Sequence, residues 1–495
     1  MSSEAPTLLI RADADPRMGT GHVMRCLALA QCWLDHVGPV TLAAARLPAG
    51  LRDRLIAEGV SVRTVSDQRA DIVRLARELS AAVVVLDGYH FTTEDERAVR
   101  EAGFPVLAMD DYGHTAHTHA TWVLNQNLGA SESLYNTPAR LLLGSRYAML
   151  RREFLESKPL PRPAADVARK ILITMGGADP DNITGLMLKT FESIPADGLE
   201  LLVVIGGSNP HAAAIEQQTT AFPHRVTVRR DVTDMPDIMR QADLAVTAGG
   251  TTTWELAAYG VPMIVVTVAD NQENLAKAIH EAGLAVNLGW PDSTSPEQKH
   301  DVIHRMIGDA TRRQAMSEAG RRTVDGWGVT RVVQTLQSTP VISLRSANEG
   351  DCRIVWEWAN DSSLRSVSFS PDPIPWETHT VWFRKRLTDP ACLFLIGQDA
   401  DGCLTGMIRF DRSPEGVVVS VYLTAESRGK GYGMVLIRRG TKRALRHFQE
   451  SRVSAWILPD NPASLRTFAR AGYRDMGTRE HQGIRAHLMV FEEGN

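Results

Sequence analysis

The sequence predicts an α/β protein with two successive parallel sheets, followed by a third, α+β domain. Short β-branched runs at residues 8–10, 82–86 and 106–109 alternate with helical stretches such as 24–37. This alternation is typical of a doubly wound parallel sheet. It restarts after the first sheet, with strand candidates at residues 170–175, 201–205, 244–246 and 263–266. The last part of the chain places helical segments first and closely spaced strands afterwards, which is typical of an α+β domain.

Two proline-containing segments separate these parts. Prolines at 159, 161 and 163 interrupt both helix and strand, and Ser338-Thr339-Pro340 follows the last helical stretch of the second part. We therefore expect three domains, at residues 1–157, 158–337 and 341–495.

The composition is that of an ordinary globular protein, with 43% hydrophobic and 23% charged residues among 495. A net charge of −4 disfavours a dedicated nucleic-acid or membrane-surface binder, so small-molecule partners are expected. The five cysteines form no Cys-x-x-Cys pair, and no run approaches the ~20 apolar residues that cross a bilayer. We expect a cytoplasmic protein without nucleic-acid or membrane partners.

A glycine loop with a histidine follows the first expected strand. Gly19 and Gly21 let the backbone approach a ligand closely, and the helix that begins near His22 offers unpaired N–H groups to a diphosphate. The helix dipole favours a neutral imidazole, which can take a proton from water. The alternative is a tight strand-to-helix turn with an exposed histidine. Asp13 is expected either to steer His22 or to pair with Arg11.

Three more glycine turns follow expected strands of the second sheet, at residues 176–177, 206–207 and 249–250. In the last turn, glycines and threonines at a helix start can hold a pyrophosphate, and Glu255 can accept hydrogen bonds from two ribose hydroxyls. Alternatively, Glu255 only stabilises the first turn of its helix. The residues expected to bind substrate are Gly19, Gly21, Gly177, Gly249, Gly250, Thr251, Glu255 and Gln272.

Three histidines, His114, His117 and His119, have a spacing that invites a metal-site interpretation. They lack a nearby cysteine and match no metal-binding motif. We therefore expect a solvated loop and no metal.

The histidine-containing glycine loop and the glycine turns of the second sheet together resemble a known family, the UDP-2,4-diacetamido-2,4,6-trideoxy-β-L-altropyranose hydrolases of pseudaminic acid biosynthesis (the PseG type). The resemblance covers about residues 7–335 and implies a GT-B-like pair of Rossmann-type domains that delivers the sugar to water without a metal. It implies that His22 is the catalytic histidine, that Tyr89 and Asn271 line the sugar site, and that Glu255 contacts the uridine ribose. It rests on residues 11–30, 176–179, 249–262 and 269–272.

A second constellation consists of a strand, a basic glycine loop and a helix at residues 417–437. Successive backbone N–H groups of such a loop can grip a pyrophosphate, and the helix dipole adds to the field. The pattern Arg428-x-x-Gly431-x-Gly433 resembles the signature of the GCN5-related N-acetyltransferases (GNAT), and this resemblance implies acetyl-CoA as cosubstrate. The residues expected to bind it are Arg428, Gly429, Lys430, Gly431, Tyr432, Gly433, Asn461 and Ser464.

Within that family, residues 342–493 look like the PseH-type enzymes, which acetylate the 4-amino group of a UDP-linked altrosamine. Relatives commonly place a tyrosine at the position of Phe468, where its hydroxyl protonates the departing thiolate. Here Tyr422, Tyr473 or water replaces it, or the thiolate needs no acid. Glu426, or a water held by Ser420, is the candidate base.

The sequence thus predicts consecutive steps, in which acetylation completes a diacetamido UDP-sugar and hydrolysis then releases the sugar. Two alternatives remain open. One is a GT-B glycosyltransferase fused to a tailoring acetyltransferase, and the other is a UDP-sugar-binding regulator joined to a protein N-acetyltransferase.

Overall fold

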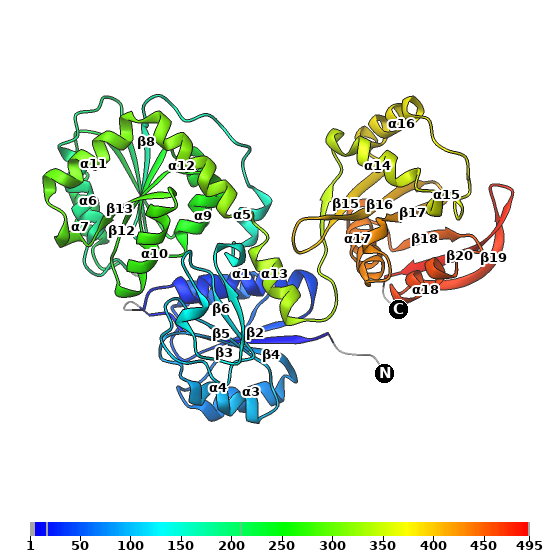
Figure 1. Ribbon diagram of the computed structural model, residues 1–495, viewed down its shortest axis with the longest axis horizontal. Helices are drawn as coiled ribbons and strands as arrows, with labels where there is room; N and C mark the ends of the chain where they lie inside the picture. The colour runs from blue at the N-terminus through cyan, green and yellow to red at the C-terminus, as the bar shows by residue number, and fades with distance from the viewer. Residues whose placement is uncertain (1–4, 16–17, 208, 494–495) are drawn as a thin grey trace. The chain divides into compact units, whose positions relative to one another are not determined.

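The structure is a computed structural model that describes residues 5–15, 18–207 and 209–493. The chain forms two compact units, Met1–Val333 and Gln334–Asn495 (Figure 1). Ser208, in one of the glycine turns named above, lies outside the described residues. Among the described residues, no helix combines the length and apolarity that crossing a bilayer requires.

The first unit begins with a seven-stranded, wholly parallel sheet of order β3-β2-β1-β4-β5-β6-β7. Its central strands are almost completely buried because helices cover both faces, as the uninterrupted apolar runs predict. The strands are β1 (Thr7–Ala12), β2 (Val40–Ala44), β3 (Ser61–Thr64), β4 (Ala81–Asp87), β5 (Val106–Met109), β6 (Trp122–Asn125) and β7 (Arg140–Leu143), and the helices are α1 (Gly21–His36), α2 (Ala49–Ala57), α3 (Arg69–Glu78), α4 (Thr93–Glu101) and α5 (Arg152–Glu156).

A second parallel sheet of the same unit has the order β10-β9-β8-β11-β12-β13. One core lies between this sheet and α6 and α11, and another lies between it and α8, α9 and α10. The strands are β8 (Lys170–Thr174), β9 (Glu200–Ile205), β10 (Arg225–Arg230), β11 (Leu244–Ala248), β12 (Met263–Val266) and β13 (Ala285–Gly289), and the helices are α6 (Ile183–Glu192), α7 (Ala212–Gln218), α8 (Met235–Gln241), α9 (Thr252–Tyr259), α10 (Asp270–Glu281), α11 (Pro296–Gly308), α12 (Ala310–Thr323) and α13 (Gly328–Leu336).

Two arginines fasten the proline-containing connector between these sheets. The buried Arg313 donates to the carbonyls of Ala165 and Asp166 on the connector, and Arg321 donates to the carbonyl of Pro159 at 2.9 Å. The connector therefore follows one fixed path, although it forms no regular element.

The second unit carries a mixed sheet of order β14-β15-β16-β17-β18-β20-β19. Helices α17 and α18 cover one face, and α14 and α16 cover the other. The strands are β14 (Ser343–Ser346), β15 (Cys392–Gln398), β16 (Leu404–Ser413), β17 (Gly416–Leu423), β18 (Arg452–Ile457), β19 (Arg474–His481) and β20 (Ile484–Glu492), and the helices are α14 (Cys352–Ala359), α15 (Ser362–Arg365), α16 (Trp376–Thr388), α17 (Tyr432–Phe448) and α18 (Pro462–Arg470).

Candidate functional sites

Polar side chains follow four neighbouring strands at the carboxyl edge of the first sheet. The strands β1, β4, β5 and β6 are adjacent and parallel. They lead directly into Asp13, Asp87, the pair Asp110 and Asp111, and Asn125, and Asp13, Asp87 and Asn125 are completely buried. Since the carboxyl ends of parallel strands meet at one edge, this edge gathers the polar groups of the domain.

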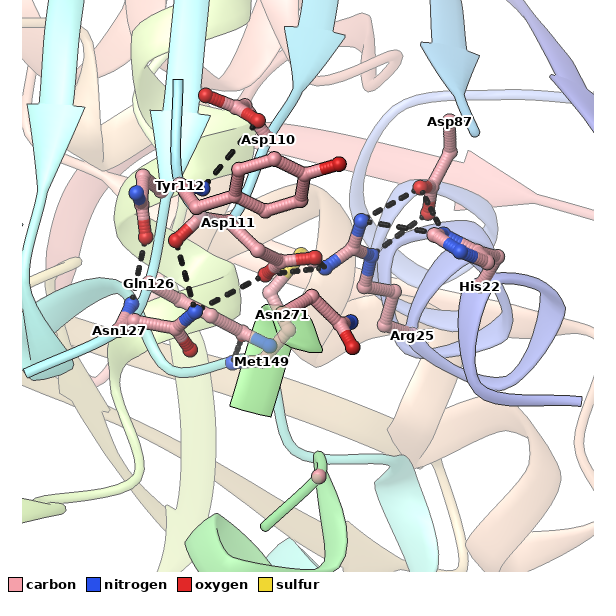
Figure 2. Close-up of polar contacts among 12 residues, drawn as sticks. His22, Arg25, Asp87, Asp110, Asp111, Tyr112, Gln126, Asn127, Met149 and Asn271 are labelled. Atoms are coloured by element: carbon pink, nitrogen blue, oxygen red, sulfur yellow. Dashed lines mark hydrogen bonds and ion pairs between the residues drawn. The ribbon is translucent and has the colours of Figure 1, made fainter. Parts of the chain in front are cut away.

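His22 and Arg25 on α1 face this edge. The Nδ1 atom of His22 lies 2.7 Å from Oδ1 of Asp87, and Arg25 donates to both carboxylate oxygens of Asp87, at 2.6 and 2.7 Å. Figure 2 shows Arg25 between Asp87 and Asp111, with His22 beside it. His22, Arg25 and Asp87 are buried, so the contacts among them hold His22 in one orientation.

The charge on Asp87 fixes which nitrogen of His22 carries a proton. Burial raises the pKa of the Asp87 carboxyl, but Arg25 and His22 outweigh burial and hold that pKa well below its usual range. The ionised carboxylate can only accept, so Nδ1–H of the neutral His22 donates to it. The Nε2 atom then keeps its lone pair and is the atom that can accept a proton.

Tyr89 and Asn271 join this cluster from opposite sides. The hydroxyl of Tyr89 donates to Oδ2 of Asp111 at 2.5 Å and accepts from Nδ2 of Asn271 at 2.7 Å. Its ring packs edge-on against His22, with centroids 4.9 Å apart. Asn271 begins α10 of the second sheet, so the site draws on both halves of the unit. The structure thus brings together His22, expected from the resemblance to be the catalytic histidine, and Tyr89 and Asn271, expected to line the sugar site.

Asp13 takes the second of the two roles expected for it. Its Oδ2 pairs with Arg11 at 2.7 Å, and its Oδ1 accepts from the backbone N–H groups of Ala45 and Arg46. The residue that steers His22 is Asp87, which sequence reasoning missed together with Arg25 and Asp111. Asp87 ends an apolar strand, but only the adjacency of β4 and β1 in the sheet brings it to α1.

The turn that contains Gly177 packs closely against the loop that contains Gly19 and Gly21. A Cβ atom on Gly177 would lie 2.7 Å from Oγ1 of Thr20, in the loop between Gly19 and Gly21. Gly19 has a φ of +74°, which disfavours any other residue there. The two loops therefore meet at the edge where His22 lies.

The turn before α9 uses part of its hydrogen-bonding capacity internally. Gly249 N–H is 3.1 Å from Oε1 of Gln272, which also accepts from Val268 N–H, and Gly250 N–H donates to the carbonyl of Ala248. Gln272, expected to touch substrate, thus holds the turn through Oε1. Thr253 and Trp254 N–H donate back to the carbonyls of Gly250 and Thr251, so the N–H groups of Thr251 and Thr252 are the donors that this turn leaves for a ligand.

Glu255 forms a buried ion pair in the first turn of α9. Arg151 donates to its Oε1 from Nε and Nη2, at 3.1 and 2.8 Å, and Arg151 also binds Glu153. Burial raises the pKa of the Glu255 carboxyl, and Arg151 opposes that rise. Because Arg151 contacts only Oε1, Oε2 is left to accept from a ribose.

The expectation that His114, His117 and His119 form a solvated loop is wrong for the first two. Only His119 is exposed; His117 is 2% exposed and lies between Glu96, 2.6 Å from its Nδ1, and Asp110, 3.7 Å from its Nε2. The physical reason is that Asp110 directly follows β5 and binds both histidines, so they lie against the edge of the sheet.

Asp110, His114 and His117 are also close enough together to be a candidate cation site. However, Oδ1 of Asp110 lies only 2.7 Å from Nδ1 of His114, and Oδ2 accepts from Gly113 N–H at 2.6 Å. Two ligands of a tetrahedral zinc ion lie roughly 3.3 Å apart. The distances fit a hydrogen-bonded ion cluster better than a metal centre. Burial lowers the pKa of His117, but Asp110 and Glu96 raise it to about 9.

The second unit opens its sheet next to the basic glycine loop. Strands β17 and β18 pair only at Val417 with Val453 and Val418 with Ser454. Beyond that point β17 and β18 are no longer paired with each other, although β17 stays paired with β16, and Ser420 and Tyr422 lie on this part of β17. The loop continues from β17 to α17, with φ of +74° at Gly429 and +86° at Gly431. The backbone N–H groups at the start of α17 are thereby presented at the opening.

The other residues expected at this loop are held as follows. Arg428 donates to Oγ of Ser363 at 2.6 Å and to the carbonyl of Leu423, and Asn461 caps α18 by accepting from Ser464 N–H at 3.0 Å. Gly433 is buried, and a Cβ there would lie 3.0 Å from Leu423, so α17 packs closely on β17. Lys430 is exposed and Tyr432 is half-buried.

The candidates for acid and base differ in accessibility. Tyr473 is 3% exposed, and its hydroxyl shares a 2.6 Å hydrogen bond with Thr441 inside the core, next to Phe468. It is therefore unavailable as an acid. Tyr422 packs at the edge of the core beneath α14 and α16, and Glu426 is exposed in the turn after β17.

Two regions of the chain match known protein families. Residues 170–326 match the glycosyltransferase family 28 C-terminal domain, and residues 342–474 match the acetyltransferase (GNAT) domain. The chain therefore joins a family 28-like region to a GNAT region. The crystal structure of MurG from Acinetobacter baumannii matches with a TM-score of 0.50 and 17% identity, over 68% of this chain and 100% of that chain. The first unit has the GT-B fold, and the second has the mixed sheet of a GNAT domain.

Three curated relatives cover different parts of the chain. The spore coat polysaccharide biosynthesis protein SpsG of Bacillus subtilis is 27% identical over 41% of this chain, which spans 58% of that relative's length. The UDP-2,4-diacetamido-2,4,6-trideoxy-beta-L-altropyranose hydrolase of Campylobacter jejuni is 22% identical over 57% of this chain and 99% of its own length. An uncharacterised protein of Methanocaldococcus jannaschii is 20% identical over 94% of this chain and 96% of its own length.

Proposed function

We propose that the chain is a bifunctional enzyme of pseudaminic acid biosynthesis that acts twice on one UDP-linked amino sugar. The second unit transfers an acetyl group from acetyl-CoA to the sugar's 4-amino group, and the first unit then hydrolyses UDP-2,4-diacetamido-2,4,6-trideoxy-β-L-altropyranose to the free sugar and UDP. The observation that carries the proposal is the His22–Asp87 pair beside Tyr89 and Asn271. The likeness to the hydrolase of Campylobacter jejuni supports the choice of substrate.

In the hydrolysis, His22 is the base. Its Nε2 atom takes a proton from water as the water oxygen bonds to the anomeric carbon, and the bond from that carbon to the phosphate oxygen breaks with its electron pair leaving on UDP. Asp87 holds the imidazole and stabilises the imidazolium that forms, as the buried carboxylate of a catalytic triad does. The proton on His22 then passes to solvent.

The leaving group is met by backbone donors instead of a metal. The N–H groups at the starts of α1 and α9, with Gly19, Gly21 and Gly177 allowing close approach, are placed to bind the diphosphate. Oε2 of Glu255 accepts from the ribose. Tyr89 and Asn271 contact the sugar.

In the acetyl transfer, the N–H groups of the loop from Gly429 to Gly433 hold the pyrophosphate of acetyl-CoA. The thioester then lies along the stretch of β17 that is not paired with β18, and the amine attacks the thioester carbonyl. The nitrogen–carbon bond forms, the carbon–sulfur bond breaks with its electron pair leaving on the CoA thiolate, and the amine proton leaves through a water held at Ser420. The thiolate then takes a proton from solvent. Both cosubstrates are metabolites of the cytoplasm, where the proposal places the enzyme.

The test supplies the UDP-linked 4-amino sugar with and without acetyl-CoA and follows acetylation and UDP release by NMR. We expect UDP release only after acetylation, and release from the acetylated UDP-sugar with water as the only acceptor. Release of UDP before acetylation contradicts the order of steps. A requirement for a second sugar or lipid acceptor indicates a glycosyltransferase instead.

A further inference from the structure

Asp111 binds three side chains of the first unit at once. It accepts two hydrogen bonds from Nη1 of Arg25, both at 2.8 Å, and one from Nδ2 of Asn127 at 3.1 Å (Figure 2). It also accepts one from the hydroxyl of Tyr89 at 2.5 Å. Its side chain is only 10% exposed. No resemblance or comparison described above assigns it a role.

The contact with Asp111 determines how Tyr89 is used. A phenol has one proton, and Asp111, a carboxylate paired with Arg25, can only accept it. Burial and Asp111 both raise the pKa of the Tyr89 hydroxyl, so the proton stays in place. The oxygen of Tyr89 is then an acceptor, which is the role it plays towards Nδ2 of Asn271. The amide of Asn271 is thereby oriented, and its Oδ1 is left to accept from water or substrate.

Asp111 also balances the charge beside the base. Nη2 of Arg25 lies 3.2 Å from Nδ1 of His22, and the guanidinium is shared between Asp87 and Asp111. The titratable groups that border His22 are Arg25, Asp87 and Tyr89, with Cys26 on the far side of Asp87. Without Asp111, part of the Arg25 charge is uncompensated, and a positive charge on His22 becomes less favourable.

We propose that Asp111 is a positioning residue for the hydrolysis, which orients Asn271 through Tyr89 and offsets the charge of Arg25 next to His22. This inference rests on the proposed hydrolysis. Asp111 acts through two of its contacts, Arg25, which lies beside His22, and Tyr89, which binds Asn271.

The first test is Asp111→Asn in the full chain. Asparagine has nearly the same shape but can donate to the Tyr89 hydroxyl, which then donates to Asn271, so the bond from residue 111 to Tyr89 and the bond from Tyr89 to Asn271 both reverse direction. We expect kcat for UDP release to fall about 10- to 100-fold with KM changed less than threefold, since orientation is lost while the diphosphate site is kept. The acid limb of the pH–rate profile should move to lower pH by about half a unit to one unit. Asp111→Glu, which keeps the charge, should leave that limb in place.

A control and a second readout separate this inference from the proposed function. Asp35→Asn removes a carboxylate at an exposed ion pair with Arg152 and should leave kcat and the acid limb unchanged. NMR of 13C-labelled histidines, with the His22 signal assigned by its loss in His22→Gln, should show a lower pH midpoint for His22 in Asp111→Asn than in the natural chain. Equal midpoints and equal acid limbs overturn the inference. Failure of the natural chain to release UDP refutes the hydrolysis, while the NMR titration still tests the charge balance.

Discussion

At the scale of single residues, the first unit depends on one proton on one nitrogen. Asp87 is completely buried and accepts from His22, Arg25 and the thiol of Cys26. A buried carboxylate with this many donors stays ionised, and it therefore selects the His22 tautomer with a free Nε2.

Asp87→Asn should reduce kcat for UDP release at least about 100-fold. The asparagine amide can donate to Nδ1 of His22, which favours the tautomer with the proton on Nε2 and removes the base. Stopped assays of UDP release over a range of pH measure the effect, with the exposed Asp35→Asn as the matched control. Activity within threefold of the natural chain would show that Asp87 does not set the tautomer.

His117 makes the stability of the first unit depend on pH. Its pKa is raised from 6.5 to about 9, so its contribution is fully present below the unfolded value and is lost as pH rises through the folded value. The shift corresponds to at most about 3 kcal/mol. Urea unfolding of the natural chain and of His117→Gln should therefore differ most in mildly acidic buffer, below pH 6.5, and converge in alkaline buffer. His119→Gln, at an exposed position, should show no such convergence.

Much of the candidate site could be predicted from residue types in the sequence, and the remainder required the sheet order. His22, Tyr89 and Asn271 lie in short motifs, so a resemblance found them. Asp87 and Asp111 contact α1 only because β4 lies next to β1, and β5 next to β4. Sequence spacing does not reveal this adjacency, because β2, β3 and their helices lie between β1 and β4 in the chain. The same adjacency buries His117, which the local spacing indicated to be solvated.

At the scale of elements, the connector between the two parallel sheets is held by a buried cation that donates to backbone carbonyls. Arg313 is 0% exposed and donates to the carbonyls of Met306 and Ile307 at 2.6 Å, and to Ala165 and Asp166. Burial lowers the pKa of this guanidinium. The prolines predict that regular structure is interrupted at the connector. They do not predict that Arg313 on α12 binds the connector's carbonyls.

Arg313→Met should destabilise the first unit by about 2–4 kcal/mol, because the substitution keeps the volume but leaves buried carbonyls without donors. Urea unfolding followed by fluorescence measures the loss. Arg312→Met, on the exposed face of the same helix, should cost less than about 0.5 kcal/mol. Equal effects of the two substitutions would mean that the four carbonyls do not depend on Arg313.

At the scale of the whole molecule, the chain consists of two units with separate cores. The cores of the parallel sheets contain no residue of the mixed sheet, and those of the mixed sheet contain no residue before Ile342. The fold of each unit was predictable because hydrophobic periodicity and glycine turns are local signals. Each candidate site also draws its residues from one unit, so a substitution in one site should leave the other intact.

Two single-site variants should therefore complement each other in solution. His22→Ala removes the base of the hydrolase, and Gly431→Val disturbs the acetyl-CoA loop, because φ is +86° there and a Cβ would meet Pro340 at 3.3 Å. Alone, the first should accumulate acetylated UDP-sugar and the second should leave the amino sugar unchanged. Mixed in equal amounts, they should convert the UDP-linked amino sugar and acetyl-CoA to free diacetamido sugar and UDP. Gly416→Val is the matched control, since Gly416 also has a positive φ but faces open space, far along the chain from the loop. A control supplies the acetylated UDP-sugar directly to the second variant, which should hydrolyse it. If it does so but the mixture still stops at the acetylated UDP-sugar, the intermediate does not leave the chain that makes it, and the prediction is wrong.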